Sequence, residues 1–385
     1  MNPDITAAGR RLPSLTGMRF LAALLVFLYH AADARVFADQ KVSEGFSAAV
    51  GKAGTVGVSF FFVLSGFVLT WTARPDDTAR RFWRRRVAKI FPNHLVTWAV
   101  VLILALLGGR VLDLGTALVN LLLLHAWAPG FEVLFSMNDV SWSLSCELFF
   151  YLAFPLLLPL IARIQPSRLW AWAGGVVAAV VCVPLLAELL PGPAGLDIYS
   201  FWLVYALPPV RCLEFLLGIL MARIVLTGRW VYSVGLAPAG LLAVAGYLLA
   251  LWVPQLYGVV AATVVPLALV VPAAAVADLE GRPSPFRGAA MVWLGEVSFA
   301  FYMLHRLVLT FGHQALGAER AWGTPAAIVL LVAALVIGLA LAAALHKLVE
   351  RPAMRLIAGT ARRDTATAGP AAAGPATAPA PGPAA

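Results

Sequence analysis

The sequence predicts an all-α fold: a polytopic membrane helix bundle of about ten transmembrane helices with both termini cytoplasmic. The chain has 385 residues, of which 61% are hydrophobic and only 12% are charged, and its mean hydropathy is +0.87. Ordinary soluble domains are about 45–50% apolar and about 25% charged. Apolar segments of roughly 20 residues, the length that a helix needs to cross a bilayer, recur along this chain. An integral membrane protein is therefore expected.

Ten apolar segments account for the predicted number of helices. In chain order they are residues 15–32, 54–72, 90–108, 144–162, 169–190, 200–222, 230–252, 256–277, 291–313 and 324–346. A further apolar stretch, residues 116–127, is only about a dozen residues long, so it is interfacial, re-entrant or a short eleventh span.

The basic residues indicate the orientation. If the N-terminus is cytoplasmic and residues 116–127 do not span, most of the 28 Lys and Arg residues fall in inner loops, as the positive-inside rule requires. A full span at 116–127 would move the later basic clusters outside. The sequence is thus divided into a cytoplasmic N-terminal segment, 1–13, a transmembrane domain, 14–358, and an Ala/Pro-rich cytoplasmic tail, 359–385, which is expected to be disordered.

Composition and motifs weigh against several classes of function. The net charge of +9 could suggest a nucleic-acid partner, but the basic residues lie between apolar segments rather than along one exposed face. Cys146, Cys182 and Cys212 show no metal-ligand spacing, so free thiols and no metal site are expected. There is no glycine pattern typical of nucleotide binding. Ala32-Asp33-Ala34 resembles a signal-peptidase site, but the apolar region before it is longer than a usual signal core.

Arg19 and His30 share the first predicted helix. At about 1.5 Å per residue they are about 16 Å apart along its axis, so they cannot grip one small group, although a long ligand could contact both. Ionisable groups inside a membrane segment are costly and favour a functional role. The alternative is that Arg19 reaches lipid headgroups and His30 only ends the helix.

A second polar cluster, Asp139 to Glu147, opens the fourth predicted span. If Glu147 lies at the depth of His30, its carboxylate would orient the imidazole and leave the other ring nitrogen free to take a proton from a hydroxyl. A structural Glu147, bonded to nearby Trp or Ser side chains, is the equal alternative.

Further polar residues lie in or beside the spans. Ser65 and Gly66 would let a helix or a substrate approach closely. The basic run that ends in Arg85, Arg86 and Lys89 could bind an anionic, phosphate-rich cofactor or anionic lipid.

Two more groups lie deep in the later spans. Arg211 and Glu214, spaced i and i+3, predict an intrahelical ion pair inside the bundle. His305, next to Arg306, either lines the same cavity as the earlier residues or bonds to another helix. Glu350-Arg351-Pro352 is expected to end the last helix.

Taken in order, six pieces resemble the acyltransferase 3 family of membrane-bound O-acyltransferases. They are Leu15 to His30, Gly57 to Phe67, Arg85 to Pro92, Trp142 to Glu147, Ser298 to His305 and Glu350 to Pro352. The family moves an acyl group, usually acetyl, from acyl-CoA to a hydroxyl. The opening motif from Leu12, the compact length and the tail look most like the macrolide 3-O-acyltransferases of actinomycetes.

The resemblance implies roles for particular residues. Arg19 and His30 match the family's arginine and histidine pair, and Glu147 matches the glutamate of its tryptophan-led motif. Lys89 departs from the family pattern, which has an arginine there, and a lysine offers a point charge rather than a bidentate fork.

The mechanism expected from the resemblance uses acetyl-CoA, or another acyl-CoA, and no metal. Its phosphates would be held by Arg85, Arg86, Lys89 and Arg19. His30, oriented by Glu147, would deprotonate the acceptor, with Ser145 or Arg211 stabilising the oxyanion. The substrate pocket would be lined by Ser65, Trp142, Ser145, Arg211, Glu214 and His305.

The expected acceptor is a macrolide or other polyketide, in a bacterial cytoplasmic membrane and in contact with lipid but not nucleic acid. O-acetylation of an envelope glycan or lipid-linked saccharide is the alternative. A transporter of such a molecule is a further one, although the chain shows no paired broken helices in corresponding halves.

Overall fold

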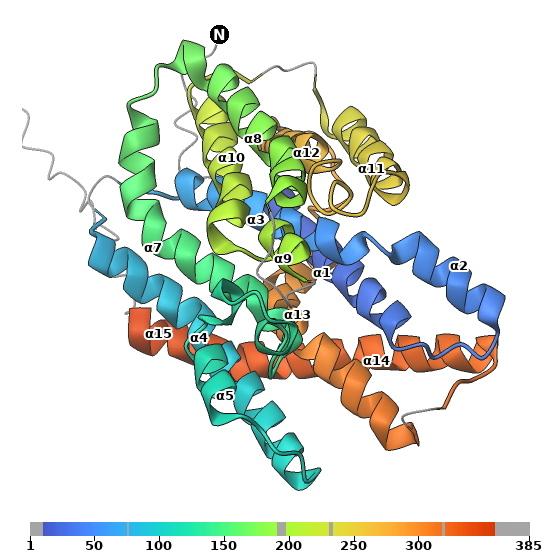
Figure 1. Ribbon diagram of the computed structural model, residues 1–385. Helices are drawn as coiled ribbons and strands as arrows, with labels where there is room; N and C mark the ends of the chain where they lie inside the picture. Colours follow the sequence, from blue (N-terminus) through green and yellow to red (C-terminus); the bar gives the residue numbers. More distant parts are fainter. Residues whose placement is uncertain (1–10, 75–76, 191–197, 231–233, 318–319, 359–385) are drawn as a thin grey trace, which may run out of the picture.

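The computed structural model describes residues 11–74, 77–190, 198–230, 234–317 and 320–358, which form a helical bundle (Figure 1). Within these ranges there is no strand, and Phe37 and Trp322 form an isolated bridge. The all-α prediction is confirmed. Residues 1–10 of the expected N-terminal segment and the whole tail, 359–385, lie outside the described residues.

Each of the ten predicted segments corresponds to a long helix. These helices are α1 (Pro13–Asp33), α3 (Ala53–Trp71), α4 (Ala79–Leu107), α7 (Trp142–Ala162), α8 (Leu169–Leu189), α10 (Pro208–Leu226), α11 (Leu236–Trp252), α12 (Val264–Leu279), α13 (Ala289–Gly317) and α14 (Thr324–Leu345). Shorter helices lie between them, namely α2 (Gln40–Val50), α5 (Leu114–Leu121), α6 (Phe131–Leu134) and α9 (Tyr199–Tyr205), and α15 (Arg351–Ala358) follows α14.

Only some of these ten helices are both long and apolar enough to cross a membrane. Among the described residues, seven helical segments are both long and apolar enough: those containing α1, α3, α4, α7, α8, α13 and α14. Helices α11 and α12 are apolar but have only 17 and 16 residues. Helix α10 has 19 residues and carries Arg211, Glu214 and Arg223.

Two predicted spans are interrupted in the structure. The span expected at 200–222 is broken because Pro208 and Pro209 lack the N–H groups that would continue α9, and they instead begin α10. The span expected at 256–277 begins late, since residues 253–263 form turns before α12.

The apolar stretch at 116–127 is not a full span. Its helix, α5, has eight residues, about 12 Å in length, and a 3-10 turn, His125–Trp127, follows. Asp113 caps α5, because its carboxylate accepts the Thr116 N–H at 2.6 Å. This hydrogen bond lowers the pKa of Asp113.

Helix α3 is the centre of the bundle and packs against α1 and α10 (Figure 1). In α3, 78% of the apolar window is buried, against 17% for the segment that contains α14. A Cβ atom added at Gly66 would lie 2.0 Å from the carbonyl oxygen of Phe215, and one at Gly218 would lie 2.0 Å from that of Val63. The close approach expected at Gly66 is confirmed, and it requires glycine on both helices.

Candidate active site

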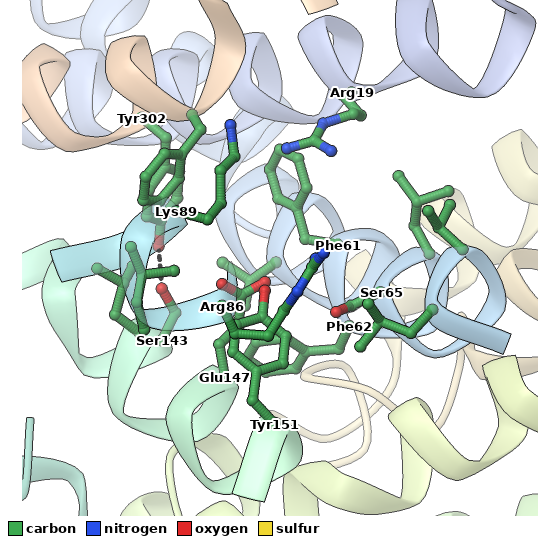
Figure 2. A pocket seen from close by; sticks show the side chains of 17 residues that line it. Arg19, Phe61, Phe62, Ser65, Arg86, Lys89, Ser143, Glu147, Tyr151 and Tyr302 are labelled. Carbon is green, nitrogen blue, oxygen red and sulfur yellow. Dashed lines mark hydrogen bonds between the residues drawn. The ribbon is translucent and has the colours of Figure 1, made fainter. Parts of the chain in front are cut away.

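A polar cavity of about 100 Å³ lies among α1, α3, α4, α7 and α13 (Figure 2). Four side chains supply its charges: Arg19 from α1, Arg86 and Lys89 from α4, and Glu147 from α7. Three cations thus face one carboxylate. The remaining walls are formed mainly by apolar and aromatic side chains, among them Phe61, Phe62, Tyr151, Phe299 and Tyr302.

Glu147 and Arg86 are held by the tyrosine one turn after Glu147. The side chain of Tyr151 interacts with Glu147 and with Ser65. The guanidinium of Arg86 lies 5.6 Å from the ring centroid of Phe82 and 5.8 Å from that of Tyr151, a distance at which cation–π attraction is significant. Arg86 is therefore stacked at the cavity wall, with its Nε buried and without a hydrogen-bond partner.

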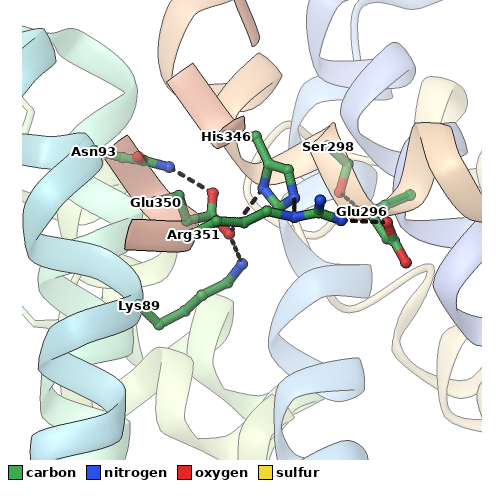
Figure 3. A network of polar contacts seen from close by, with 8 residues as sticks. Lys89, Asn93, Glu296, Ser298, His346, Glu350 and Arg351 are labelled. Atoms are coloured by element: carbon green, nitrogen blue, oxygen red, sulfur yellow. Dashed lines mark hydrogen bonds and ion pairs between the residues drawn. The ribbon is translucent and has the colours of Figure 1, made fainter. Parts of the chain in front are cut away.

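Lys89 reaches the cavity from a second polar network (Figure 3). Its Nζ is paired with Glu350, which also accepts a hydrogen bond of 2.9 Å from the Asn93 side chain. The Nδ1 of His346 lies 3.3 Å from the same carboxylate. The expectation that Glu350-Arg351-Pro352 ends the last helix is wrong, because the helical backbone continues through a π-helical segment, His346–Glu350, into α15. Glu350 ties α4 to this π-helical segment between α14 and α15, and it offsets the charge of Lys89.

Arg85 does not line the cavity. Its guanidinium pairs with Asp77 through both carboxylate oxygens. Arg85 therefore does not join Arg86 and Lys89 at the cavity as expected, because its guanidinium is held by Asp77.

His30 contacts His305 rather than Glu147. The Nδ1 of His30 lies 3.0 Å from the Nε2 of His305, and the ring centroids are 5.1 Å apart. The predicted pair of His30 and Glu147 is wrong, because Glu147 lines the cavity at Arg19 instead. Of the two possibilities for His305, bonding to another helix is the one that the structure contains.

The register of α7 explains this error. Arg306, the neighbour of His305, binds Asp33 at 2.7 Å and Asp139 at 2.8 Å. Asp139 therefore lies at the level of the two histidines. Glu147 is two helical turns further along the chain, about 12 Å deeper, which brings it to the level of Arg19.

The remaining predicted pocket residues divide into two groups. Ser65 lines the cavity, as expected. Trp142, Ser145, Arg211 and Glu214 do not: Trp142 packs on Phe62 and Tyr205, and the Ser145 hydroxyl donates to the Leu123 carbonyl at 2.6 Å. The expectation that these four residues line the same cavity as Ser65 is therefore not met.

The ion pair expected on α10 is confirmed. Arg211 Nη2 lies 3.1 Å from Glu214 Oε2, and their side chains are 1% and 2% exposed. Arg211 also donates to the Ser59 hydroxyl at 3.1 Å. This pair lines a separate, much smaller cavity between α8 and α10.

The sequence-based prediction missed Phe61, Tyr151 and Tyr302 as cavity residues. Tyr302 lies within a motif that was recognised, but a tyrosine among phenylalanines gave no sign that it faces a polar site. Tyr151 could have been found, because it follows Glu147 by four residues and so shares its helix face.

Comparisons with known proteins agree with the predicted resemblance. A family model described as an acyltransferase domain matches residues 12–346. The chain is 43% identical to Acyltransferase MdmB of Streptomyces mycarofaciens, over 93% of this chain and 95% of that protein. No solved structure gives a significant match.

Two further relatives are more distant. Exopolysaccharide production protein ExoZ of Rhizobium meliloti (strain 1021) is 28% identical over 81% of this chain and 93% of its own. The putative peptidoglycan O-acetyltransferase YrhL of Bacillus subtilis (strain 168) is 28% identical over 56% of this chain and 33% of its own.

Proposed function

Because the chain belongs to the acyltransferase 3 family and is an acyltransferase, we propose that it moves a short acyl group, most simply acetyl, from acyl-CoA to a hydroxyl of a macrolide. The observation that carries the donor assignment is the excess of cations at the cavity, where Arg19, Arg86 and Lys89 meet the carboxylate of Glu147 and, among the described residues, only Lys89 has a further carboxylate, that of Glu350. CoA carries several phosphate charges, and arginine binds phosphate through charge-assisted hydrogen bonds. The match to Acyltransferase MdmB along nearly the whole of both chains supports acyl transfer, and the macrolide assignment rests on the resemblance of the opening motif from Leu12 to the macrolide 3-O-acyltransferases.

The cavity would hold only the narrow part of the donor. Its volume of about 100 Å³ is below the 300–1,000 Å³ or so of pockets that enclose a drug-sized ligand. The phosphate-rich head would therefore remain at the mouth of the cavity, within reach of the charged ends of Arg86 and Lys89 on α4. We place this end of the bundle in the cytoplasm of a bacterial cell, in accord with the positive-inside rule.

The acyl end would then extend toward His30. Tyr302 lines the cavity, and His305, which contacts His30, lies one turn further along α13. His30 takes the proton of the acceptor hydroxyl as its oxygen attacks the thioester carbonyl. The new C–O bond forms, the C–S bond breaks, and the proton passes from His30 to the departing CoA sulfur.

Glu147 would act at a different place. It lies with Arg19 and Arg86 at the cavity wall, so its carboxylate orients the two guanidinium groups that bind the donor. In this proposal Glu147 contributes to donor binding, and His30 is the base.

The experiment is an incubation of the purified protein with labelled acetyl-CoA and a macrolide that bears a free hydroxyl. We expect a labelled ester, absent with His30→Ala and retained with His313→Ala, which changes a histidine that hydrogen-bonds to the Arg320 carbonyl away from the cavity. A normally folded His30→Ala protein with full activity would refute the proposed chemistry.

A glycan acceptor is the second candidate, favoured by the names of ExoZ and YrhL. Offering a polysaccharide in the same assay separates the two candidates, because only the true acceptor gains label. Absence of every ester, with movement of the acceptor across vesicles, would instead indicate a transporter.

A further inference from the structure

We propose that His305 is a positioning residue that fixes the tautomer of His30, so that Nε2 of His30 is the atom that receives the acceptor's proton. This rests on the proposed function, in which His30 is the base. The assignment follows from the hydrogen bonds, the burial and the packing of the two histidines.

A backbone carbonyl determines the tautomer of His305. Its Nδ1 lies 2.7 Å from the backbone carbonyl oxygen of Tyr302. A carbonyl oxygen only accepts hydrogen bonds, so Nδ1 of His305 must carry a proton. A neutral imidazole has one ring proton, which leaves Nε2 of His305 with a lone pair.

The tautomer of His305 in turn determines that of His30. The Nε2 of His305 lies 3.0 Å from the Nδ1 of His30. Because the first atom accepts, the second must donate, and the single ring proton of neutral His30 is on Nδ1. The Nε2 of His30 is then unprotonated and free to act as a base.

The assignment requires a neutral His305. A doubly protonated His305 would donate from Nε2 to His30 and so reverse the assignment. His305 is 0% exposed and its neighbour, Arg306, already carries a positive charge. Both nearby carboxylates, Asp33 and Asp139, are paired with Arg306. A second buried cation at His305 has no dedicated partner, so the neutral form is favoured.

Packing fixes the position of the His305 ring. The ring of His305 is packed among Phe27, Phe301 and Tyr302, with centroid distances of 6.4, 5.8 and 5.8 Å. Tyr302 is in turn held by Ser143, whose hydroxyl lies 2.8 Å from its own. The acceptor atom offered to His30 is therefore fixed, and the same tyrosine that lines the donor cavity supplies the carbonyl that orients His305.

The direct test is nitrogen-15 solid-state NMR of the histidine-labelled wild-type protein in lipid. The spectrum of His30→Gln identifies the signals of His30 by their disappearance. We expect a protonated Nδ1 and an unprotonated Nε2 for His30. A protonated Nε2 would overturn the proposal, and this measurement needs neither substrate nor activity.

A pair of variants tests the consequence for turnover. His305→Gln keeps an acceptor near the position of Nε2, whereas His305→Leu removes it. We expect kcat to fall roughly 10- to 100-fold in the Leu variant, by analogy with the loss of partners that orient metal-bound histidines. KM for acyl-CoA should be unchanged, and the Gln variant should recover most of kcat. The matched control is His313→Leu on the same helix.

The outcomes separate this proposal from the proposed function. Equal losses in the Gln and Leu variants, or full kcat in the Leu variant, would overturn the positioning role while ester formation by the wild type still stood. If the wild type forms no ester, the proposed function fails, and the NMR spectrum alone decides whether His305 sets the tautomer of His30.

Discussion

Substitution of Arg86 by Gln should weaken acyl-CoA binding, whereas the same substitution at Arg85 should not. The two arginines are adjacent in the sequence and have equal charge. Arg86 lines the cavity and stacks on the rings of Phe82 and Tyr151, while Arg85 is bound by Asp77 outside it. Arg85 is thus a matched control for charge and for position on α4.

The size of the effect follows from these contacts. A hydrogen bond from a charged donor contributes about 1.5–3 kcal/mol, and each 1.4 kcal/mol corresponds to about a tenfold change in affinity. If Arg86 binds one phosphate of the donor, Arg86→Gln should raise KM for acyl-CoA by about 10- to 150-fold. For Arg85→Gln we expect a change of less than about threefold, because Arg85 is paired with Asp77 outside the cavity and the long-range effect of a partly exposed charge is screened by salt.

The assay is the initial rate of CoA thiol release by purified protein in lipid nanodiscs, over a range of acyl-CoA concentrations at a fixed acceptor concentration. Thermal unfolding of each variant checks that the fold is intact. Equal KM values for the two variants, or a larger effect at Arg85, would refute the assignment of the donor to this cavity.

Three other changes probe the bundle around the site. Glu214→Gln leaves Arg211 buried without its carboxylate and should cost about 3–5 kcal/mol of stability in thermal unfolding. The double variant Arg211→Met with Glu214→Leu should lose less stability than Glu214→Gln. A larger loss in the double variant would contradict this explanation. Gly218→Ala places a Cβ 2.0 Å from a carbonyl of α3 and should cost about 1–3 kcal/mol, while Gly240→Ala, with open space around it, should not. Glu350→Gln removes the charge that offsets Lys89, so KM for acyl-CoA should fall. The fall should be less than about tenfold, because Lys89 is 25% exposed and its charge is partly screened. A rise in KM would instead show that Glu350 acts by holding Lys89 in place.

The fold could be predicted from the sequence because the membrane imposes a simple rule. A helix must be apolar over about 20 residues to cross the bilayer, and this pattern can be read without knowledge of its neighbours. The interruptions were harder to predict. At Pro208 the apolar pattern continues across a break in the helix, so hydropathy alone merges α9 and α10 into one segment.

The ion pair of Arg211 and Glu214 and the close packing at Gly66 were also predictable, because both depend on local spacing. The partner of His30 was not. Its identity depends on how far α7 and α13 are shifted along their axes relative to α1, and a shift of two turns replaces Glu147 by Asp139 at the level of the histidines.

Composition, and spacing along single helices, were thus enough to predict a membrane environment, the approximate helix positions and the residues that bear the chemistry. The partners of these residues became known only from the folded bundle, in which Glu147 lies with Arg19 and Arg86, and His30 contacts His305. The reason is physical, because contacts between helices depend on their relative rotation and axial shift, and these are set by packing over the whole bundle rather than by any one segment.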